Sequence, residues 1–220
     1  QVQEMVETAR AKKVFLMEAL WSRFMPGIRQ ALELSQSGAI GKVVSVKADF
    51  GFKAPFLPDN RLFNKDLGGG SRLDLGIYPL FLSYLILGKP TTVKASAIFG
   101  STGVDEQCGM VLTYADGQLA LLDSTLLADT DCIGLIQGET GQIRIHSRFH
   151  ENKGVTLVRT EQPDQSFAFE RETHGYDYEA QHVMQCLTEG KTESPLWSLD
   201  DSLNLMELLD AVRAEAGIVY

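Results

Sequence analysis

The sequence predicts an α+β fold: an open, largely antiparallel or mixed sheet with helices packed on one face, preceded by a short remnant (helix plus strand) of a doubly wound domain. Short β-like runs separated by turn signals fill the middle of the chain, between residues 92 and 159. Helical patterns stand before and after this region. Because consecutive strands joined by short turns pair antiparallel, these two observations favour a sheet flanked by helices.

Residues 1–20 are interpreted as the remnant of a separate domain. The apolar side chains of residues 2–12 are spaced as one helical face, and residues 14–17 (VFLM) form a short apolar run typical of a buried parallel strand. Such a strand needs neighbouring strands, and the sequence shows none for it. We therefore expect a domain boundary after residue 20, with residues 21–220 forming a second domain for substrate binding and oligomerisation.

The second domain is expected to begin with a helix, a strand, a loop and a long helix. Residues 24–37 read as a helix, with a proline tolerated in the first turn. Apolar and polar residues alternate from 43 to 52, which predicts a strand. Residues 53–70 are rich in prolines, glycines and charges, and are expected to form a loop. Residues 71–87 are apolar nearly all round, which predicts a buried helix.

Six further strands are expected in the middle of the chain. Residues 115–117 and 138–141 carry hairpin signals that separate some of them. The predicted strands cover residues 93–99, 107–114, 118–127, 132–137, 142–146 and 155–159.

Two helices close the predicted fold. In the first, residues 176–187, the expected inner side carries Ala180, Val183, Met184 and Leu187. Ser198 is placed to cap the second, with an acidic residue three positions later. The expected inner stripe of that last helix is Leu205, Leu208, Leu209 and Val212.

Composition excludes several classes of protein. A net charge of −9 over 220 residues disfavours binding to nucleic acid, and no stretch approaches the roughly 18 apolar residues of a membrane span. The first residues have neither the basic start nor the apolar core of a signal peptide. Cys108, Cys132 and Cys186 lack CxxC spacing and indicate buried thiols in a reducing compartment. We expect a cytoplasmic protein.

The stretch from Gly68 to Pro79 is the most informative for chemistry. Asp74 and Tyr78 are four residues apart, so they share one face of the predicted helix, close to a turn of three glycines. Pro79 is expected to bend the helix just past Tyr78. A carboxylate and a phenol in an apolar helix must be hydrogen-bonded or face a wet cavity. They either line a pocket, or Asp74 braces the glycine loop and Tyr78 bonds a nearby carbonyl.

Four segments carry a resemblance to a known family. They are residues 68–78, residues 17–26 (MEALWSRFMP), residues 61–64 (RLFN), and residues 175–180 (GYDYEA) with the later 193–195 (ESP). In their order along the chain they resemble the C-terminal domain of the glucose-fructose oxidoreductase / inositol dehydrogenase (Gfo/Idh/MocA) family, and within it the dimeric dihydrodiol dehydrogenase branch. The likeness spans almost the whole chain.

The resemblance implies an NAD- or NADP-dependent dehydrogenase acting on a sugar, a polyol or a cyclic diol. It implies that Asp74 orients substrate hydroxyls and that Tyr78 transfers the proton. The family supplies a lysine from a Glu-Lys-Pro motif in its first, dinucleotide-binding (Rossmann) domain, which would lower the pKa of the phenol. The motif is absent here, and Gly88-Lys89-Pro90 only echoes it. The chain alone is therefore expected to be inactive, with its cofactor site mainly in the other domain.

Further substrate-binding candidates are Trp21, Arg23, Phe52 and Arg61. Trp21 and Arg23 adjoin the crossover between the domains, and either line the cleft or pack the domain joint. Phe52 either stacks on substrate or belongs to the core, and Arg61 either binds a hydroxyl or carboxylate or is a solvated loop residue. The histidines show no metal-binding spacing, and no metal is expected. They are His146, His150, His174 and His182.

Two functional readings remain open at this point. The first is one half of an enzyme that moves a hydride between a nicotinamide and an alcohol carbon. The second is a non-catalytic sugar-binding or assembly module. Either form is expected to be a homodimer that pairs through its open sheet, because residues 93–99 and 118–127 carry apolar residues on both sides.

Overall fold

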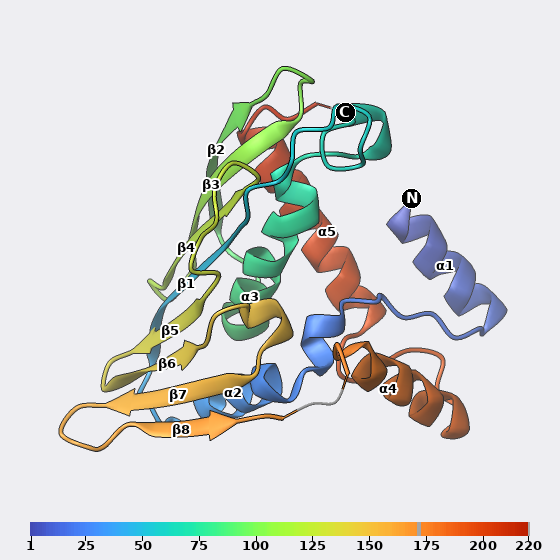
Figure 1. Ribbon diagram of the computed structural model, residues 1–220. Coiled ribbons are helices and arrows are strands. Elements are labelled where there is room, and N and C mark those ends of the chain that lie inside the picture. The colour runs from blue at the N-terminus through green and yellow to red at the C-terminus, as the bar shows by residue number, and fades with distance from the viewer. Residues whose placement is uncertain (171–172, 220) are drawn as a thin grey trace.

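The computed structural model describes residues 1–170 and 173–219, and shows one mixed sheet with helices on a single face (Figure 1). The sheet has eight strands in the order β2-β3-β4-β1-β5-β6-β7-β8. Their bounds are β1 Val43–Gly51, β2 Thr92–Phe99, β3 Asp105–Thr113, β4 Leu119–Thr125, β5 Gly134–Gly138, β6 Gly141–Ile145, β7 Gly154–Arg159 and β8 Gln165–Ala168. The predicted fold class is confirmed.

Three helices cover the inner face of the sheet: α3 packs on β1 and β4, α5 on β2, and α2 on β6 and β7. α1 and α4 lie farther from the strands (Figure 1). The helices are α1 Val2–Lys12, α2 Pro26–Gln36, α3 Ile77–Leu87, α4 Tyr176–Thr188 and α5 Leu199–Glu215. The short turns are η1 Trp21–Phe24, η2 Lys65–Leu67, a π-helical turn η3 Arg72–Gly76, and η4 Phe149–Glu151.

The sheet is mixed because β1 runs parallel to β4, while the remaining pairs are antiparallel. Between these two strands the chain leaves the sheet, passes through the long helix and returns by the β2–β3 hairpin. The crossover places the start of α3 over the centre of the sheet, in contact with β1 and β4.

The core lies between the inner face of the sheet and the helices. Alternate residues of the central strands, such as Val46 of β1 and Leu112 of β3, are fully buried there. The inner stripe predicted for α5 is confirmed, since Leu205, Leu208, Leu209 and Val212 are all buried. Ser198 and Asp201 form the expected capping box at its start.

The predicted start of the chain is confirmed for its helix, α1. Residues 14–17, predicted as a strand, join no strand among the described residues and connect α1 to η1. In this segment the Leu16 amide donates a hydrogen bond to the Thr192 carbonyl oxygen. A lone apolar run cannot form a ladder without a neighbouring strand, and the sheet of this chain is built from other segments.

The inner side predicted for α4 is wrong. Ala180, Met184 and Leu187 are exposed, and the buried residue on this helix is Cys186. The helix docks instead through a face that includes His182, whose ring lies 5.0 Å from that of Phe24 in η1. Aromatic packing against η1 therefore outweighs the apolar stripe.

The long helix predicted over 71–87 forms, but its first turn is π-helical. The irregularity thus precedes Tyr78, whereas a bend was expected just after it. Pro79 is the third residue of α3, in the first helical turn, where a missing amide hydrogen is tolerated. Strand β8 was not predicted, because its short sequence, QSFA, is largely exposed at the sheet edge.

Candidate active site

The centre of the candidate site is a hydrogen bond between two residues that are far apart in sequence. The indole Nε1 of Trp21 donates to the Tyr78 hydroxyl oxygen at 3.0 Å. Trp21 opens η1, and Tyr78 is the second residue of α3. The crossover segment and the long helix therefore meet at the phenol that the sequence singled out.

An aromatic cluster of Trp21, Phe50, Tyr78, His150 and Tyr176 surrounds this bond. The rings of Phe50 and His150 stack with centroids 4.1 Å apart, and their centroids lie 5.5 Å and 5.4 Å from that of the Tyr78 ring. Tyr176 lies on Trp21, with centroids 4.5 Å apart. These residues come from η1, β1, α3, η4 and α4, so five separate elements converge on the phenol.

Asp74 lies one turn before Tyr78, within the π-helical turn, and is held by Arg61. The Arg61 Nη1 atom is 2.5 Å from Asp74 Oδ1. The arginine side chain is 64% exposed and the aspartate side chain 24% exposed, so solvent reaches this pair. The bond to Asp74 raises the pKa of the Arg61 guanidinium. Arg61 in this position orients the Asp74 carboxylate through Oδ1, and Oδ2 can accept a hydrogen bond from a hydroxyl group.

The environment of Tyr78 keeps its phenol protonated near neutral pH. Burial raises the pKa of Tyr78, and the negative charges of Asp74 and Glu179 raise it further. The hydrogen bond from Trp21 acts in the opposite direction and lowers the pKa. A phenol ordinarily titrates near about pH 10, so within this chain Tyr78 is a weak base.

Arg23 and Phe52 lie elsewhere in the structure. Arg23 is buried, and its Nε atom donates to the Leu196 carbonyl oxygen at 2.9 Å, while burial lowers the pKa of its guanidinium. Phe52 packs on a small separate cluster that includes Phe63. The structure thus brings together Trp21, Asp74, Tyr78 and Arg61, and does not bring Arg23 or Phe52 to them by any described contact.

Three members of the aromatic cluster were missed by the sequence reasoning. Phe50 continues the inward phase of β1 after Val46 and Ala48, so the alternation could have placed it under the helix. His150 was considered only as a metal ligand. Its position depends on the packing of η4 against η1, where the Ser22 hydroxyl donates to the His150 carbonyl oxygen at 2.5 Å. Tyr176 lies in the segment 175–180 that carries the family resemblance, but nothing in that segment indicated that its ring would lie on Trp21.

The cysteines are separate from one another and from any metal-binding arrangement. Cys108, Cys132 and Cys186 are buried free thiols, as predicted. Within residues 1–170 and 173–219, no three histidine, cysteine or acidic side chains gather as a metal site would require. Over that same part of the chain, no helix has the length and apolar character needed to cross a bilayer.

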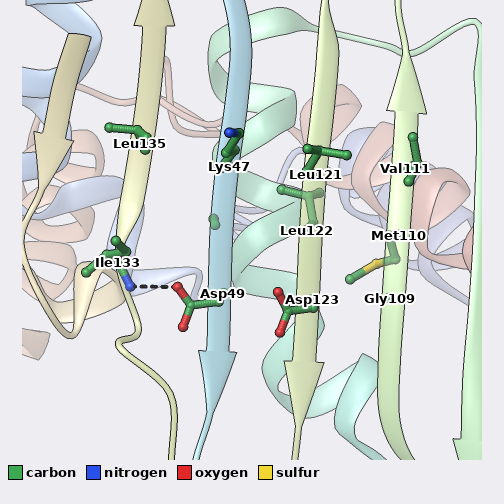
Figure 2. A pocket seen from close by; sticks show the side chains of 11 residues that line it. Lys47, Asp49, Gly109, Met110, Val111, Leu121, Leu122, Asp123, Ile133 and Leu135 are labelled. Atoms are coloured by element: carbon green, nitrogen blue, oxygen red, sulfur yellow. Dashed lines mark hydrogen bonds between the residues drawn. The ribbon is translucent and has the colours of Figure 1, made fainter.

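The sheet face away from the helices carries a shallow depression of about 470 Å³ (Figure 2). Its apolar lining comes mostly from outward side chains of the central strands, with Lys47, Asp49 and Asp123 beside them. Its lining includes no residue of β2, whose outward side carries Lys94, Ser96 and the exposed Ile98. The apolar residues with exposed side chains are Val111, Leu121 and Ile133, with Leu135 partly exposed.

Comparison with known protein families gives a match to the GFO/IDH/MocA C-terminal domain over residues 28–144. Across its full length the chain is 36% identical to the trans-1,2-dihydrobenzene-1,2-diol dehydrogenase of Xenopus tropicalis, and covers 68% of that protein. The chain belongs to the GFO/IDH/MocA family.

A second curated relative and a solved structure are also similar to this chain. The D-xylose 1-dehydrogenase (NADP(+)) of Hypocrea jecorina is 31% identical over the whole chain, which spans 64% of it. The solved structure of KijD10, a 3-ketoreductase from Actinomadura kijaniata in complex with NADP and TDP-benzene, has a TM-score of 0.83 at 24% identity, over 97% of this chain and 66% of that one. The two curated relatives are both named dehydrogenases, which confirms the predicted enzyme class, and the solved structure shows the same fold.

Proposed function

We propose that this chain is the substrate-binding half of an NAD(P)-dependent dehydrogenase that oxidises or forms a CH–OH group on a sugar, a polyol or a cyclic diol. The observation that carries the proposal is the Tyr78 hydroxyl held by Trp21 beside the Arg61–Asp74 pair, in a family of oxidoreductases. The aromatic cluster supplies flat apolar walls for a ring, and Asp74 supplies an acceptor for its hydroxyls.

In this mechanism the chain binds the alcohol and moves its proton. Asp74, oriented by Arg61, accepts a hydrogen bond from a substrate hydroxyl and fixes the ring against the aromatic cluster. Tyr78 takes the proton from the reacting hydroxyl during oxidation and returns it during reduction. When bound, the nicotinamide supplies the hydride chemistry.

Tyr78 needs a nearby cation to act as a base, because burial and the neighbouring carboxylates raise its pKa. We propose that a lysine of the dinucleotide-binding domain supplies that charge. An ammonium group close to the phenol favours the tyrosinate. The chain without that domain would therefore be inactive.

The glycine turn before Asp74 does not fit the phosphates of a dinucleotide. A Cβ atom on Gly69 would lie 2.8 Å from three backbone carbonyl oxygens, and one on Gly70 would overlap the Asp105 carboxylate. These glycines allow close packing within the chain, and their surroundings are acceptors, which repel phosphate. This supports a cofactor, NAD or NADP, bound mainly by another domain.

Residues 1–20 are proposed to belong to that other domain, with residues 21–220 forming the substrate-binding and oligomerisation domain. Trp21, the first residue after the boundary, reaches Tyr78, so the crossover itself would connect cofactor and substrate sites. The buried free thiols support a reducing, cytoplasmic compartment.

The experiment that tests this function measures turnover by the enzyme in which this chain follows its dinucleotide-binding domain. Aldoses, polyols and cyclic trans-diols would be screened with NAD and NADP by absorbance of the reduced cofactor. We expect turnover of at least one class, and cofactor binding by the full enzyme but not by residues 1–220 alone. Absence of turnover with every class, despite cofactor binding, would favour the non-catalytic binding module.

We further propose a homodimer formed through the outer face of the sheet. Val111, Leu121 and Ile133 expose apolar surface around a depression that a second copy would cover (Figure 2). Helices cover only the other face. A patch of exposed apolar side chains on the uncovered side of a sheet is characteristic of an interaction site.

A further inference from the structure

The start of the helix that carries Asp74 and Tyr78 is held by a carboxylate on another element. Asp105, the first residue of β3, is fully buried. Its Oδ2 atom accepts the Arg72 amide hydrogen at 2.7 Å and the Ser71 hydroxyl at 3.1 Å. Arg72 opens the π-helical turn, so a negative charge sits at the positive end of the helix.

The glycine turn is shaped to admit this carboxylate. Gly70 has a φ of 119°, a conformation that side chains rarely adopt, and a Cβ atom there would overlap Asp105 Oδ1. That oxygen has no hydrogen-bond partner among the described residues. The Ser71 hydroxyl is also hydrogen-bonded to the Ser124 hydroxyl of β4 at 3.2 Å, so residues of two strands, β3 and β4, bond to the same helix start.

Burial raises the pKa of the Asp105 carboxyl, and the Arg72 amide, the Ser71 hydroxyl and the Arg72 charge act against that rise. Keeping a buried carboxylate with one unbonded oxygen costs folding free energy. The Arg72 guanidinium that acts on this carboxyl is itself buried, so a neutral residue at position 105 would leave a buried cation without its neighbouring negative charge. Asp105 therefore anchors the helix start through two hydrogen bonds and through the neighbouring Arg72 charge.

The π-helical turn gives that role its geometry. The i→i+5 hydrogen bonds of a π-helical turn enclose one residue more than the i→i+4 bonds of an α-helix. In an α-helix each residue advances the chain by about 100° around the axis. Relaxation of Arg72–Gly76 to an α-helix would therefore rotate Asp74 relative to Tyr78, and would carry Asp74 away from Arg61.

We propose that Asp105 is a positioning residue, which holds the π-helical turn in the register that sets Asp74 and Arg61 beside Tyr78. It touches neither Tyr78 nor the aromatic cluster in any described contact, and acts through the helix start. This inference rests on the proposed function for its catalytic readout, and on Tyr78 titration for a readout that does not need turnover.

The first test is a double-mutant cycle in the full-length enzyme. Asp105→Asn keeps the size of the side chain and removes its charge. We expect kcat to fall by about 10- to 100-fold, the range for a misplaced catalytic group, with cofactor affinity unchanged. Asp74→Asn alone should lower kcat, and the double variant should have a kcat only slightly below that of Asp74→Asn. Fully additive losses would contradict the proposal.

A core variant separates positioning from stability. Leu157→Ala removes a buried side chain of β7, far along the sheet from β3. Even if Leu157→Ala lowers Tm as much as Asp105→Asn does, it should leave kcat nearly unchanged. If it lowers kcat as much as Asp105→Asn does, Asp105 is only structural.

The second test uses residues 1–220 alone and needs no activity. In Asp105→Asn the NMR-detected pKa of the Tyr78 phenol should fall toward its ordinary value, because a loosened helix start reduces both its burial and the influence of Asp74. Leu157→Ala should leave it in place. An unchanged Tyr78 pKa in Asp105→Asn would overturn the inference, even if the enzyme proves inactive on every substrate.

Discussion

The carboxylates on the two faces of the sheet have different partners. On the helix side, Asp74 is engaged by Arg61, and Asp105 is engaged by the start of the helix. On the outer face, Asp49 and Asp123 stand at matched positions of the parallel strands β1 and β4 (Figure 2). Asp49 accepts hydrogen bonds from two backbone amides, whereas no described hydrogen bond reaches the Asp123 side chain.

The two sides of the sheet also depend on different features of the sequence. The outer face follows from strand alternation, so its exposed apolar residues can be read from period two. The site around Tyr78 is assembled by contacts between residues distant in sequence, such as the Trp21–Tyr78 bond across 57 positions. Changes to the outer face should therefore alter association, and changes to the inner side should alter chemistry.

The largest effect on the outer face is expected from Leu121→Asp. Leu121 is 38% exposed and lies in the depression, so a charge there would be buried between two copies. We expect the dimer Kd to rise by at least about 100-fold, which corresponds to roughly 3 kcal/mol. Sedimentation of residues 1–220 measures it. Met184→Asp, on the exposed side of α4, is the control and should leave association unchanged.

A smaller effect, on the inner side, is expected from Trp21→Phe. The indole bond lowers the pKa of Tyr78, so its loss should raise that pKa. Because the tyrosinate is the active base, the rising limb of the kcat/KM profile should move to higher pH. If the limb moves by about one pH unit, activity at a fixed pH below it should fall about tenfold.

Trp197→Phe is the matched control for this change, since its indole donates to Glu18 at 2.9 Å and lies outside the aromatic cluster. An equal displacement of the pH profile in both variants would show that the Trp21 bond has no special role.

The smallest effect is expected from Asp123→Asn. Burial first, and then the charge of Asp49, raises the pKa of Asp123. A raised carboxyl pKa means that the folded chain binds a proton more readily than the unfolded chain. Asp123 therefore destabilises the fold at neutral pH, and this cost declines as the pH falls toward the folded pKa.

Asp123→Asn should accordingly stabilise the chain at pH 7 by less than about 1 kcal/mol, because solvent screens a partly exposed group. The gain should shrink as the pH falls through the folded pKa and should be largely gone by about pH 3, below the ordinary carboxyl pKa. Urea unfolding at the two values measures it. A gain that is equal at both would mean that the charge of Asp123 is not the cause.

Local patterns were sufficient for most of the fold. The alternation along residues 43–52 and the cap at Ser198 each depend on near neighbours, and both are confirmed. α4 was misread because a modest apolar stripe lost to aromatic contacts with η1. β8 escaped notice because an edge strand buries few side chains and needs no apolar alternation.

The site was only partly predictable for the same reason. Asp74 and Tyr78 are linked by helical spacing, and the sequence places them together. Phe50 and His150 meet Tyr78 only after β1 and η4 have packed. The start of the π-helical turn is bonded to Asp105, 34 positions after Ser71, so no local signal announces it.

The most direct test of the central claim is Tyr78→Phe in the full-length enzyme, with Tyr84→Phe as the matched control. Tyr84 lies on the same helix and bonds Asp201 and Asn204. Loss of the Tyr78 hydroxyl should lower kcat by about 100- to 10,000-fold, the range for general acid–base groups, with cofactor binding intact. Tyr84→Phe should remain active. Normal turnover by Tyr78→Phe would contradict the account and leave Tyr78 as a structural partner of Trp21.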